Sequence, residues 1–426
     1  MKILLTSAGG IYDNAFPETR KNQSGFGIMI RALADMLVKD GDDVDIITAS
    51  NITPGRKIGR AILVKKKWST LIFHTKFFYI MKALSANRTK GVSLTKRLKN
   101  ILYFMTASYA EHLMKKNKYD VVHINGIGFA SIGYMYACVR TNTPFVLTLH
   151  GLNSFNPDIK APPLIKNMER VYYVLNKDNK KALSTVISTG IKKRLCEVVK
   201  KDPGTISVVC NPVVNSKEAG YTPYEKADGE KVILTVGNIS KNKNQRLVVD
   251  AFARMQKEHE GKYKLFVIGG GEAPLKAHAE EMGIKNVIFT GALDKSVVNE
   301  YYKIADLCVM ASIDEGFGLS LVEGYSYGVP CVMPTAIDAY PDLYEEYACI
   351  GAENYEIPTF ANALYTALTR EWDKEKIKKK AEAFTEEVCA SSYLSVLMKA
   401  KELGTAPFDM DTMNLILKTA RTKKFY

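Results

Sequence analysis

The fold of this 426-residue chain is recognised most directly from residues 314–323, which read Asp314-Glu315-Gly316-Phe317-Gly318-Leu319-Ser320-Leu321-Val322-Glu323. The apolar run at 307–310 predicts a buried parallel strand. Two glycines around one aromatic residue predict a tight turn, and a helix is expected to begin near Leu319 and to end by Pro330. A helix that begins directly after a strand and a glycine turn presents unpaired N–H groups and the positive end of its dipole. This geometry suits a phosphate.

Two carboxylates flank the predicted phosphate site. Glu315 belongs to the turn, and Glu323 lies one turn into the helix. Carboxylates repel phosphate, so we expect them to bind hydroxyl groups, which predicts a sugar on each side of a diphosphate. The alternative is that both glutamates are solvated residues at the end of a helix.

These residues resemble the E-x7-E motif of the family 4 retaining glycosyltransferases, a family of glycosyl transferases group 1. The continuation at 323–332, Glu323-Gly324-Tyr325-Ser326-Tyr327-Gly328-Val329-Pro330-Cys331-Val332, is similar to the family's E-A-x-A-x-G-x-P-V-V run, with Gly324 in place of alanine. The resemblance implies an α/β protein of the GT-B fold, in which two Rossmann-like parallel α/β/α domains face each other across a cleft.

The length of the chain suits two domains of ordinary size. We expect an N-terminal acceptor-binding domain over 1–215 and a C-terminal nucleotide-sugar-binding domain over 216–404. The remaining segment, 405–426, is expected to cross back to the first domain, as the closing helix of GT-B proteins does.

The first half of the chain carries three candidate donor contacts. A strand at 2–7, a loop containing Gly25 and Gly27 and a helix at 28–39 predict one half-unit of a doubly wound sheet. The resemblance implies that both glycines lie against the donor diphosphate, although Gly-x-Gly is also ordinary loop chemistry. His150, in Thr148-Leu149-His150-Gly151, matches the family's T-x-H-G histidine, which reaches the donor sugar. For His123 a packed, structural role is the favoured interpretation.

The second half carries the rest of the predicted site. By resemblance, Lys243 grips the phosphates, and Asn238 stands where the family usually has an arginine, so one fixed charge is missing. Glu323 would bind the ribose, while Glu315 would hold the transferred sugar. The other predicted donor-binding residues are Gly269, Gly270, Ala292, Leu293, Phe317, Gly318 and Leu319.

We expect neither a metal nor any cofactor beyond the nucleotide-sugar co-substrate. Asp43 and Asp45, and Asp409 and Asp411, have the Asp-x-Asp spacing of metal-dependent transferases. Neither pair belongs to the predicted site. Retention of the anomeric configuration is implied by the resemblance alone, and His150, Glu315 and Lys243, the predicted catalytic residues, would act by holding the donor and its leaving phosphate.

The net charge of +14 is concentrated in residues 56–118, where the only acid is Glu111 and apolar side chains alternate with the bases. This combination predicts a segment that lies on an anionic membrane surface. Nucleic acid, which we do not expect as a partner, and a merely solvated basic face are the alternatives. Residues 1–5 do not resemble a signal peptide, no apolar run reaches the ~18 residues of a span, and the seven cysteines are scattered. We therefore expect a cytoplasmic protein, peripheral on the cytoplasmic membrane face.

Together these features predict a metal-independent retaining hexosyltransferase. Its donor would be a UDP- or GDP-linked sugar, and its acceptor a hydroxyl of a glycan or lipid-linked molecule in cell-surface polysaccharide synthesis. One alternative is another GT-B enzyme, a phosphorylase or a sugar-nucleotide epimerase. The other is a basic membrane- or nucleic-acid-binding protein with a degenerate sugar site.

Overall fold

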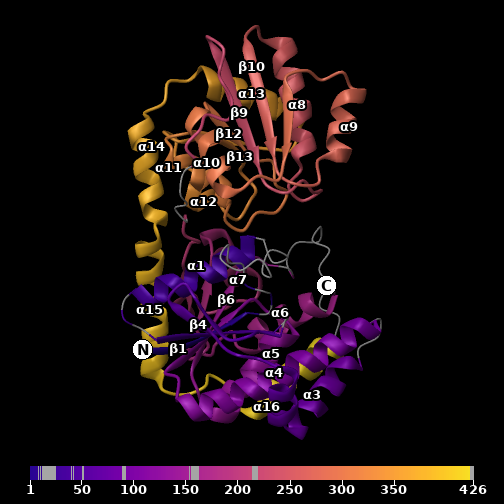
Figure 1. Cartoon of the computed structure of the whole chain (residues 1–426), viewed down its shortest axis with the longest axis vertical. Helices are drawn as coiled ribbons and strands as arrows, with labels where there is room; N and C mark the ends of the chain where they lie inside the picture. The colour runs from indigo at the N-terminus through magenta and orange to yellow at the C-terminus, as the bar shows by residue number, and fades with distance from the viewer. Residues whose placement is uncertain are drawn as a thin grey trace. The chain divides into compact units, whose positions relative to one another are not determined.

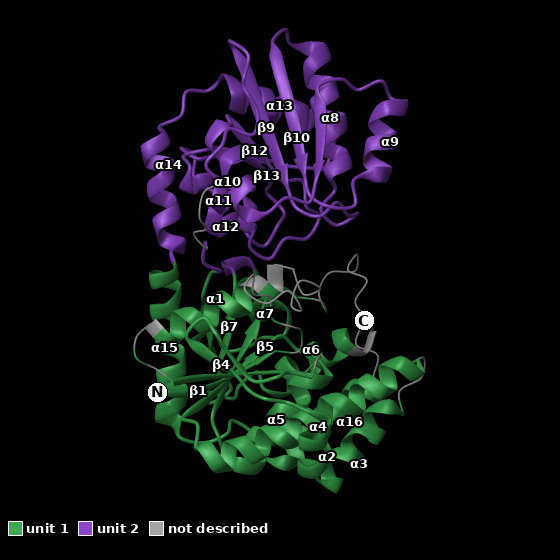
Figure 2. Ribbon diagram, viewed as in Figure 1, with its two compact units in different colours: residues 1–187, 191–210, 386–426 green, residues 188–190, 211–385 purple. Residues whose placement is uncertain are grey.

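A computed structural model of the chain describes residues 1–7, 9, 11, 25–39, 41, 43–49, 52–88, 93–152, 154, 163–213 and 219–422. The chain divides into two compact units (Figure 2). Unit 1 contains residues 1–187, 191–210 and 386–426, and unit 2 contains residues 188–190 and 211–385. Each unit is an α/β sandwich with its own sheet and its own core.

The sheet of unit 1 has the strand order β3-β4-β2-β1-β5-β6-β7-β8. All neighbouring strands are parallel except β3 and β4. The central strands are apolar runs because helices cover both faces of the sheet. The strands are β1 (Lys2–Ser7), β2 (Asp43–Thr48), β3 (Arg56–Ile58), β4 (Ala61–Leu63), β5 (Val121–Asn125), β6 (Phe145–Leu149), β7 (Ser184–Val186) and β8 (Ile206–Val208).

Helices lie on both sides of the sheet of unit 1, and α2 and α3 pack on the outside of α4 (Figure 1). Helices α1 and α15 cover one face of the sheet, and α4, α5 and α16 lie on the other side. The helices are α1 (Gly25–Lys39), α2 (Trp68–His74), α3 (Phe77–Asn87), α4 (Leu94–Asn117), α5 (Phe129–Thr141), α6 (Pro163–Leu175), most of α7 (Thr189–Val198), the short η2 (Pro203–Thr205), α15 (Glu386–Leu403) and α16 (Met410–Thr422).

Unit 2 has a fully parallel sheet with the order β11-β10-β9-β12-β13-β14. Its strands are β9 (Glu230–Val236), β10 (Lys262–Ile268), β11 (Val287–Gly291), β12 (Leu307–Val309), β13 (Cys331–Pro334) and β14 (Cys349–Ala352). Its helices are α8 (Gln245–Glu258), α9 (Ala273–Glu281), α10 (Lys295–Ile304), α11 (Leu319–Ser326), α12 (Tyr340–Leu343), α13 (Ile357–Thr369), α14 (Lys374–Ala381) and the short η3 (Glu382–Phe384).

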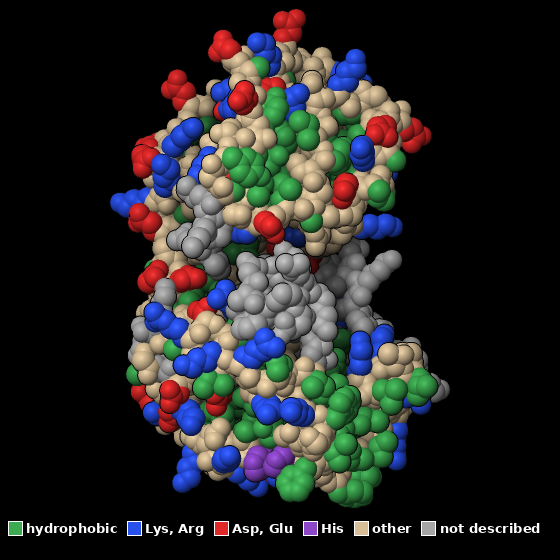
Figure 3. Space-filling view, viewed as in Figure 1, with side chains coloured by type: hydrophobic (Ala, Val, Ile, Leu, Met, Phe, Trp, Pro, Cys, Tyr) green, Lys and Arg blue, Asp and Glu red, His purple; other side chains and the backbone are tan. Residues whose placement is uncertain are grey.

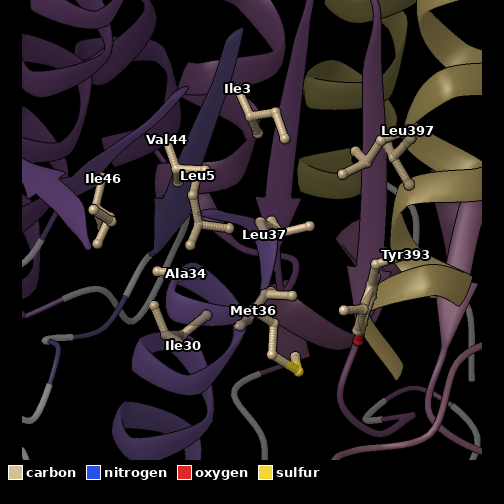
Figure 4. Close-up of a cluster of buried hydrophobic side chains, with 14 of the residues drawn as sticks. Ile3, Leu5, Ile30, Ala34, Met36, Leu37, Val44, Ile46, Tyr393 and Leu397 are labelled. Carbon is tan, nitrogen blue, oxygen red and sulfur yellow. The ribbon is translucent and has the colours of Figure 1, made fainter. Parts of the chain in front are cut away.

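The C-terminal part of the chain differs from the prediction. Residues 386–404 were expected in the second domain, but α15 belongs to unit 1 because Tyr393 and Leu397 are buried in the same cluster as Ile3 and Leu5 (Figure 4). Helix α16 also belongs to unit 1. The hydroxyl of Tyr136 in α5 donates to the carbonyl oxygen of Met413 in α16 at 3.1 Å. The chain therefore returns to unit 1 at residue 386.

The predicted boundary at 215/216 lies outside the described residues, and the division between the units follows residue 210.

A second difference from the prediction concerns the start of α1. Helix α1 begins at Gly25, three residues before the predicted start, so Gly25 and Gly27 form its first turn and are not loop residues. Among the described residues, no helix combines the length and the apolar character needed to cross a membrane.

Candidate functional site

The candidate site of unit 2 lies where its strand order reverses. Strand β9 lies between β10 and β12, so the connections that follow β9 and β12 leave the sheet in opposite directions. Open α/β sheets bind ligands at such a point, outside the carboxyl ends of the strands. The two loops are joined there: the N–H of Ile313 donates to the carbonyl oxygen of Asn242 at 2.8 Å, and the Asn242 side chain donates to the carbonyl oxygen of Asp314 at 2.9 Å.

Glu315 is held in place by three donors. Its carboxylate is paired with the Lys243 ammonium from the β9 loop. The Ser312 hydroxyl donates to Glu315 Oε2 and the N–H of Gly318 to Oε1, both at 3.3 Å. The pair of Lys243 and Glu315 therefore spans the switch point and fixes both side chains at one end of α11.

Gly318 shapes the start of α11. Its φ of +81° is a conformation that side chains disfavour, and a Cβ there would lie 3.1 Å from Leu343 Cδ1. It is the N-cap of α11, and no side chain caps the helix. The N–H of Leu321 already donates to the carbonyl oxygen of Gly318 at 2.9 Å, whereas the N–H groups of Leu319 and Ser320 precede the first hydrogen bonds of the helix. Together with the nearby Lys243 ammonium, they form a place suited to an anion.

Glu323 is fixed by residues of α10. The Lys295 ammonium lies 2.5 Å from Glu323 Oε2, and the Tyr302 hydroxyl lies 3.2 Å from the same oxygen and 2.8 Å from the carbonyl oxygen of Ser320. Burial, aided by the charge of Glu323, raises the pKa of Tyr302 well above its usual value, so the phenol remains a donor. One acceptor oxygen of Glu323 is thus occupied by α10, and the carboxylate is held in one orientation.

The glycine turn after β10 packs against the β9 loop. A Cβ on Gly269 would lie 2.1 Å from the carbonyl oxygen of Gly237, so only glycine fits there. The N–H of Gly270 donates to Asn238 Oδ1 at 3.3 Å. Asn238, which replaces the expected arginine, therefore uses its side-chain oxygen to hold the neighbouring turn and brings no charge to the site.

Ala292 and Leu293 follow β11, next to this glycine turn. The N–H of Gly269 donates to the carbonyl oxygen of Gly291 at 2.9 Å, and a Cβ on Gly270 would lie 3.8 Å from the Ala292 Cβ. The structure thus brings the predicted donor-binding residues of unit 2 to the carboxyl ends of β9, β10, β11 and β12. Their roles stay predictions.

Three of the predicted donor contacts belong to unit 1. Gly25 and Gly27 lie in the first turn of α1, and His150 directly follows β6. His150 Nε2 lies 3.0 Å from Asn125 Oδ1, and burial lowers the pKa of His150 to about 4. The imidazole is therefore neutral at physiological pH and offers a hydrogen bond, not a charge.

His123 belongs to the core of unit 1. It is fully buried in β5, with Nε2 2.5 Å from the Thr148 hydroxyl. Burial, and then the charge of His150, lowers the pKa of His123 to about 3. This agrees with the packed, structural interpretation of this residue.

Three residues of the site were not predicted. Lys295, Tyr302 and Ser312 each touch one of the two glutamates, but none belongs to the motif. The only sequence signal for Lys295 was its position four residues after Gly291, and many solvated lysines stand in similar positions.

The two Asp-x-Asp pairs have structural contacts away from unit 2. Asp45 Oδ2 accepts a hydrogen bond from the Tyr119 hydroxyl at 2.5 Å, and Asp409 Oδ1 accepts from the N–H of Thr412 at 2.7 Å near the start of α16. In the part of the chain that the structure describes, no three His, Cys, Asp or Glu side chains are grouped as metal ligands.

Two family models match the chain. The model described as "Glycosyl transferases group 1" matches residues 219–384, and the model described as "Glycosyltransferase Family 4" matches residues 23–216. Between them they cover most of the chain, and Glu315 and Glu323 lie in the first match.

Curated relatives are similar over different lengths. An alpha-monoglucosyldiacylglycerol synthase of Streptococcus pneumoniae is 42% identical over 108 residues, which are 25% of this chain and 24% of that relative. The match thus spans about a quarter of the length of this relative. A Campylobacter jejuni enzyme, the GalNAc-alpha-(1->4)-GalNAc-alpha-(1->3)-diNAcBac-PP-undecaprenol alpha-1,4-N-acetyl-D-galactosaminyltransferase, is 24% identical over 68% of this chain and 77% of its own.

A solved structure shows the same fold. The sucrose-phosphate synthase of Thermosynechococcus elongatus superposes with a TM-score of 0.67 at 17% identity, covering 93% of this chain and 98% of its own. Together with the two parallel-sheet units, this likeness confirms the predicted α/β, GT-B fold class.

Proposed function

The chain belongs to the family 4 glycosyltransferases, and we propose that it is a retaining hexosyltransferase that uses a UDP- or GDP-linked sugar. The observation that carries this proposal is the placement of Lys243 beside Glu315 at the uncapped start of α11. A diphosphate bound there would meet one ammonium and the N–H groups of a helix N-terminus.

This arrangement supports departure of the nucleotide. When the bond between the sugar C1 and the phosphate oxygen breaks, negative charge grows on the leaving diphosphate. Donors that are already oriented toward that charge lower the barrier. Lys243 and the first turn of α11 supply them, while Glu315 accepts hydrogen bonds from hydroxyls of the transferred sugar.

Glu323 would bind the ribose of the donor. Lys295 and Tyr302 occupy one of its oxygens, which leaves the other to accept hydrogen bonds from ribose hydroxyls. Because Asn238 contributes no charge, the diphosphate would depend on Lys243 more than in relatives that carry an arginine at this position.

Retention would follow from a front-face displacement. The acceptor oxygen forms its bond to C1 on the face from which the diphosphate leaves, and the acceptor proton passes to an oxygen of that diphosphate. No metal is required in this scheme. Glu315 orients the donor and does not serve as a nucleophile.

The acceptor would be a hydroxyl of a glycan or of a lipid-linked molecule used in cell-surface polysaccharide synthesis. The names of the two relatives support this class, since one is a glucosyldiacylglycerol synthase and the other acts on an undecaprenol-linked glycan. With such an acceptor the enzyme would work at the cytoplasmic face of a membrane, as a peripheral protein.

A thermal-shift panel tests donor binding. UDP, GDP and ADP sugars are added with and without EDTA to the wild type and to Lys243→Ala, Glu323→Ala and Lys241→Ala, the last being an exposed lysine of the same loop. We expect one nucleotide class to raise Tm in the wild type and in Lys241→Ala, with EDTA causing no loss. A shift that survives both site substitutions would contradict the proposed site.

Two further measurements separate the reaction from its alternatives. Nuclear magnetic resonance of the product reports whether the anomeric configuration of the donor is kept. A phosphorylase would carry a pyridoxal group on a lysine, so an absorbance band of that cofactor in the purified protein would favour that alternative.

A further inference from the structure

Helix α3 of unit 1 has two apolar faces. Tyr79, Ala83 and Ala86 are buried against the unit. Phe77, Met81 and Leu84 have the same spacing on the opposite face, and all three are exposed. The outer face of a surface helix is normally polar. The outer face of α3 therefore needs another explanation.

The exposed apolar face continues on the neighbouring helices. Trp68, Ile72 and Phe73 extend it on α2, and Leu94 and Leu98 on the first turns of α4. Phe73 is 84% exposed and Phe77 76%, values that are rare for phenylalanine. Hydrophobic side chains gather at the lower right of unit 1 in Figure 3, the region where Figure 2 labels α3. We call these eight residues the apolar face: Trp68, Ile72, Phe73, Phe77, Met81, Leu84, Leu94 and Leu98.

A hydrogen-bond network fixes the helices that carry this face. Ser108 of α4 holds the joint between α2 and α3, since its hydroxyl donates to the carbonyl oxygen of His74 at 2.7 Å and accepts from the N–H of Lys76 at 3.0 Å. The Tyr79 hydroxyl donates to the buried Glu111 carboxylate at 2.8 Å. The face is thus presented by anchored helices.

Positive charge surrounds the apolar face. Exposed lysines flank α2 and the start of α4, and others lie at the end of α4. They are Lys65, Lys67, Lys96, Lys99, Lys115 and Lys116. The only acid between residues 52 and 118 is Glu111, which is buried and paired with Lys76, Lys115 and Arg140. Over the described part of this segment no carboxylate is exposed.

We propose that the apolar face inserts into the interfacial layer of an anionic lipid bilayer. The aromatic and aliphatic tips would enter the boundary between headgroups and acyl chains, and the lysines would contact lipid phosphates. A protein partner fits less well, because lysine is depleted at protein interfaces. Nucleic acid would use the cations but not the aliphatic tips. The inference deepens the proposed lipid-linked acceptor by naming the surface that reaches the membrane.

Vesicle sedimentation of the full chain tests the proposal without any nucleotide. Vesicles of phosphatidylcholine alone are compared with vesicles that also contain phosphatidylglycerol. We expect strong binding only to the anionic vesicles, reduced severalfold by about 0.5 M NaCl, which shortens the screening length. The double variant Phe73→Asp/Phe77→Asp should bind more than about tenfold more weakly.

The matched control is Met282→Asp, which changes an exposed apolar residue of unit 2. We expect it to bind like the wild type. Circular dichroism and the nucleotide thermal shift show whether the double variant is folded. If the double variant fails to fold, insertion is measured by the fluorescence of Trp68 in the single variant Trp372→Phe, which leaves Trp68 as the one tryptophan. We expect the emission of Trp68 to shift to shorter wavelength when anionic vesicles are added.

Three outcomes would overturn the proposal. They are a wild type that stays in the supernatant with anionic vesicles, a folded double variant that binds as well as the wild type, and a wild-type dimer that the double variant abolishes. A wild type that binds nucleic acid but stays in the supernatant with anionic vesicles is a case of the first outcome. Vesicle binding by a protein that binds no nucleotide sugar would contradict the proposed function but not this inference.

Discussion

Lysines occur both in the candidate site of unit 2 and around the apolar face of unit 1, but the charges near them differ. In the site each key lysine is matched by one carboxylate, Lys243 by Glu315 and Lys295 by Glu323. Around the apolar face lysines outnumber acids, and the one acid of residues 52–118, the buried Glu111, is shared by Lys76, Lys115 and Arg140. Matched pairs hold side chains in fixed positions, which suits one small polar ligand. Unmatched positive charge beside apolar side chains suits an extended anionic surface.

Removal of Lys243 should have the largest effect. Lys243→Ala deletes the ammonium closest to the predicted leaving phosphate, so we expect kcat/KM to fall by about a hundredfold or more. The measurement is initial-rate kinetics with the donor identified by thermal shift. Lys241→Ala, in the same loop, should change the rate by less than about threefold. Equal losses in both variants would mean that the loop contributes only general positive charge.

Glu111 tests whether buried charge anchors the apolar face. Burial alone would raise the pKa of Glu111, but hydrogen bonds from Lys76, Arg140, Tyr79 and Lys115 outweigh it and lower the pKa from 4.5 to about 2. The lower pKa in the folded state means that Glu111 stabilises the fold fully above pH 4.5. This contribution, about 3 kcal/mol, should be lost as the pH falls toward 2.

Urea unfolding of Glu111→Gln checks this contribution. We expect the variant to be less stable by about 3 kcal/mol at neutral pH and to approach the wild type in acid. Glu375→Gln, an exposed glutamate on α14, should change the free energy of unfolding by less than about 0.5 kcal/mol. A constant difference between Glu111→Gln and the wild type across this pH range would contradict the role given to its charge.

Gly269 and Gly270 are adjacent in the glycine turn, but a side chain at each should affect stability differently. A Cβ on Gly269 would meet the carbonyl oxygen of Gly237, so Gly269→Ala should lower the free energy of unfolding by about 2 kcal/mol. Gly270→Ala meets only ordinary contacts, 3.7 Å from Asn238 Oδ1 and 3.8 Å from Ala292 Cβ, and should be close to wild type in Tm. The reverse order in Tm would show that this turn is arranged differently.

Lys295 should have a smaller effect on the reaction than Lys243. Lys295→Met keeps an unbranched side chain of similar length but removes the charge that is paired with Glu323. We expect the donor KM to rise by about tenfold with little change in kcat, because in the proposed site Glu323 would hold the donor equally in the ground and transition states. Lys303→Met, on the same helix but paired with Glu300, is the matched control and should be neutral in KM.

The sequence predicted the parts of the molecule that depend on local geometry. The strand, glycine turn and helix that carry Glu315 and Glu323 are contiguous, so their spacing alone indicates where both carboxylates lie. Lys295 was not predicted, because its contact with Glu323 depends on the packing of α10 on α11. The spacing of residues along the sequence does not indicate that packing. Helix α1 was predicted to begin too late because Gly25 and Gly27 have low helix propensity.

Long-range packing explains the other differences. The apolar spacing of Tyr393 and Leu397 predicts a helix but does not identify the core it joins, so α15 was placed in the wrong domain. Similarly, composition indicated a basic and apolar segment at 56–118. Only the structure distinguishes the buried Tyr79 from the exposed Phe77 two residues away.

A crystal structure of the full chain with the nucleoside diphosphate that gives the largest thermal shift tests the donor site most directly. We predict the phosphates within about 3.2 Å of Lys243 Nζ and of the N–H groups of Leu319 and Ser320, with the ribose hydroxyls on Glu323. A diphosphate bound away from the start of α11, or a ribose with no contact to Glu323, would contradict the account.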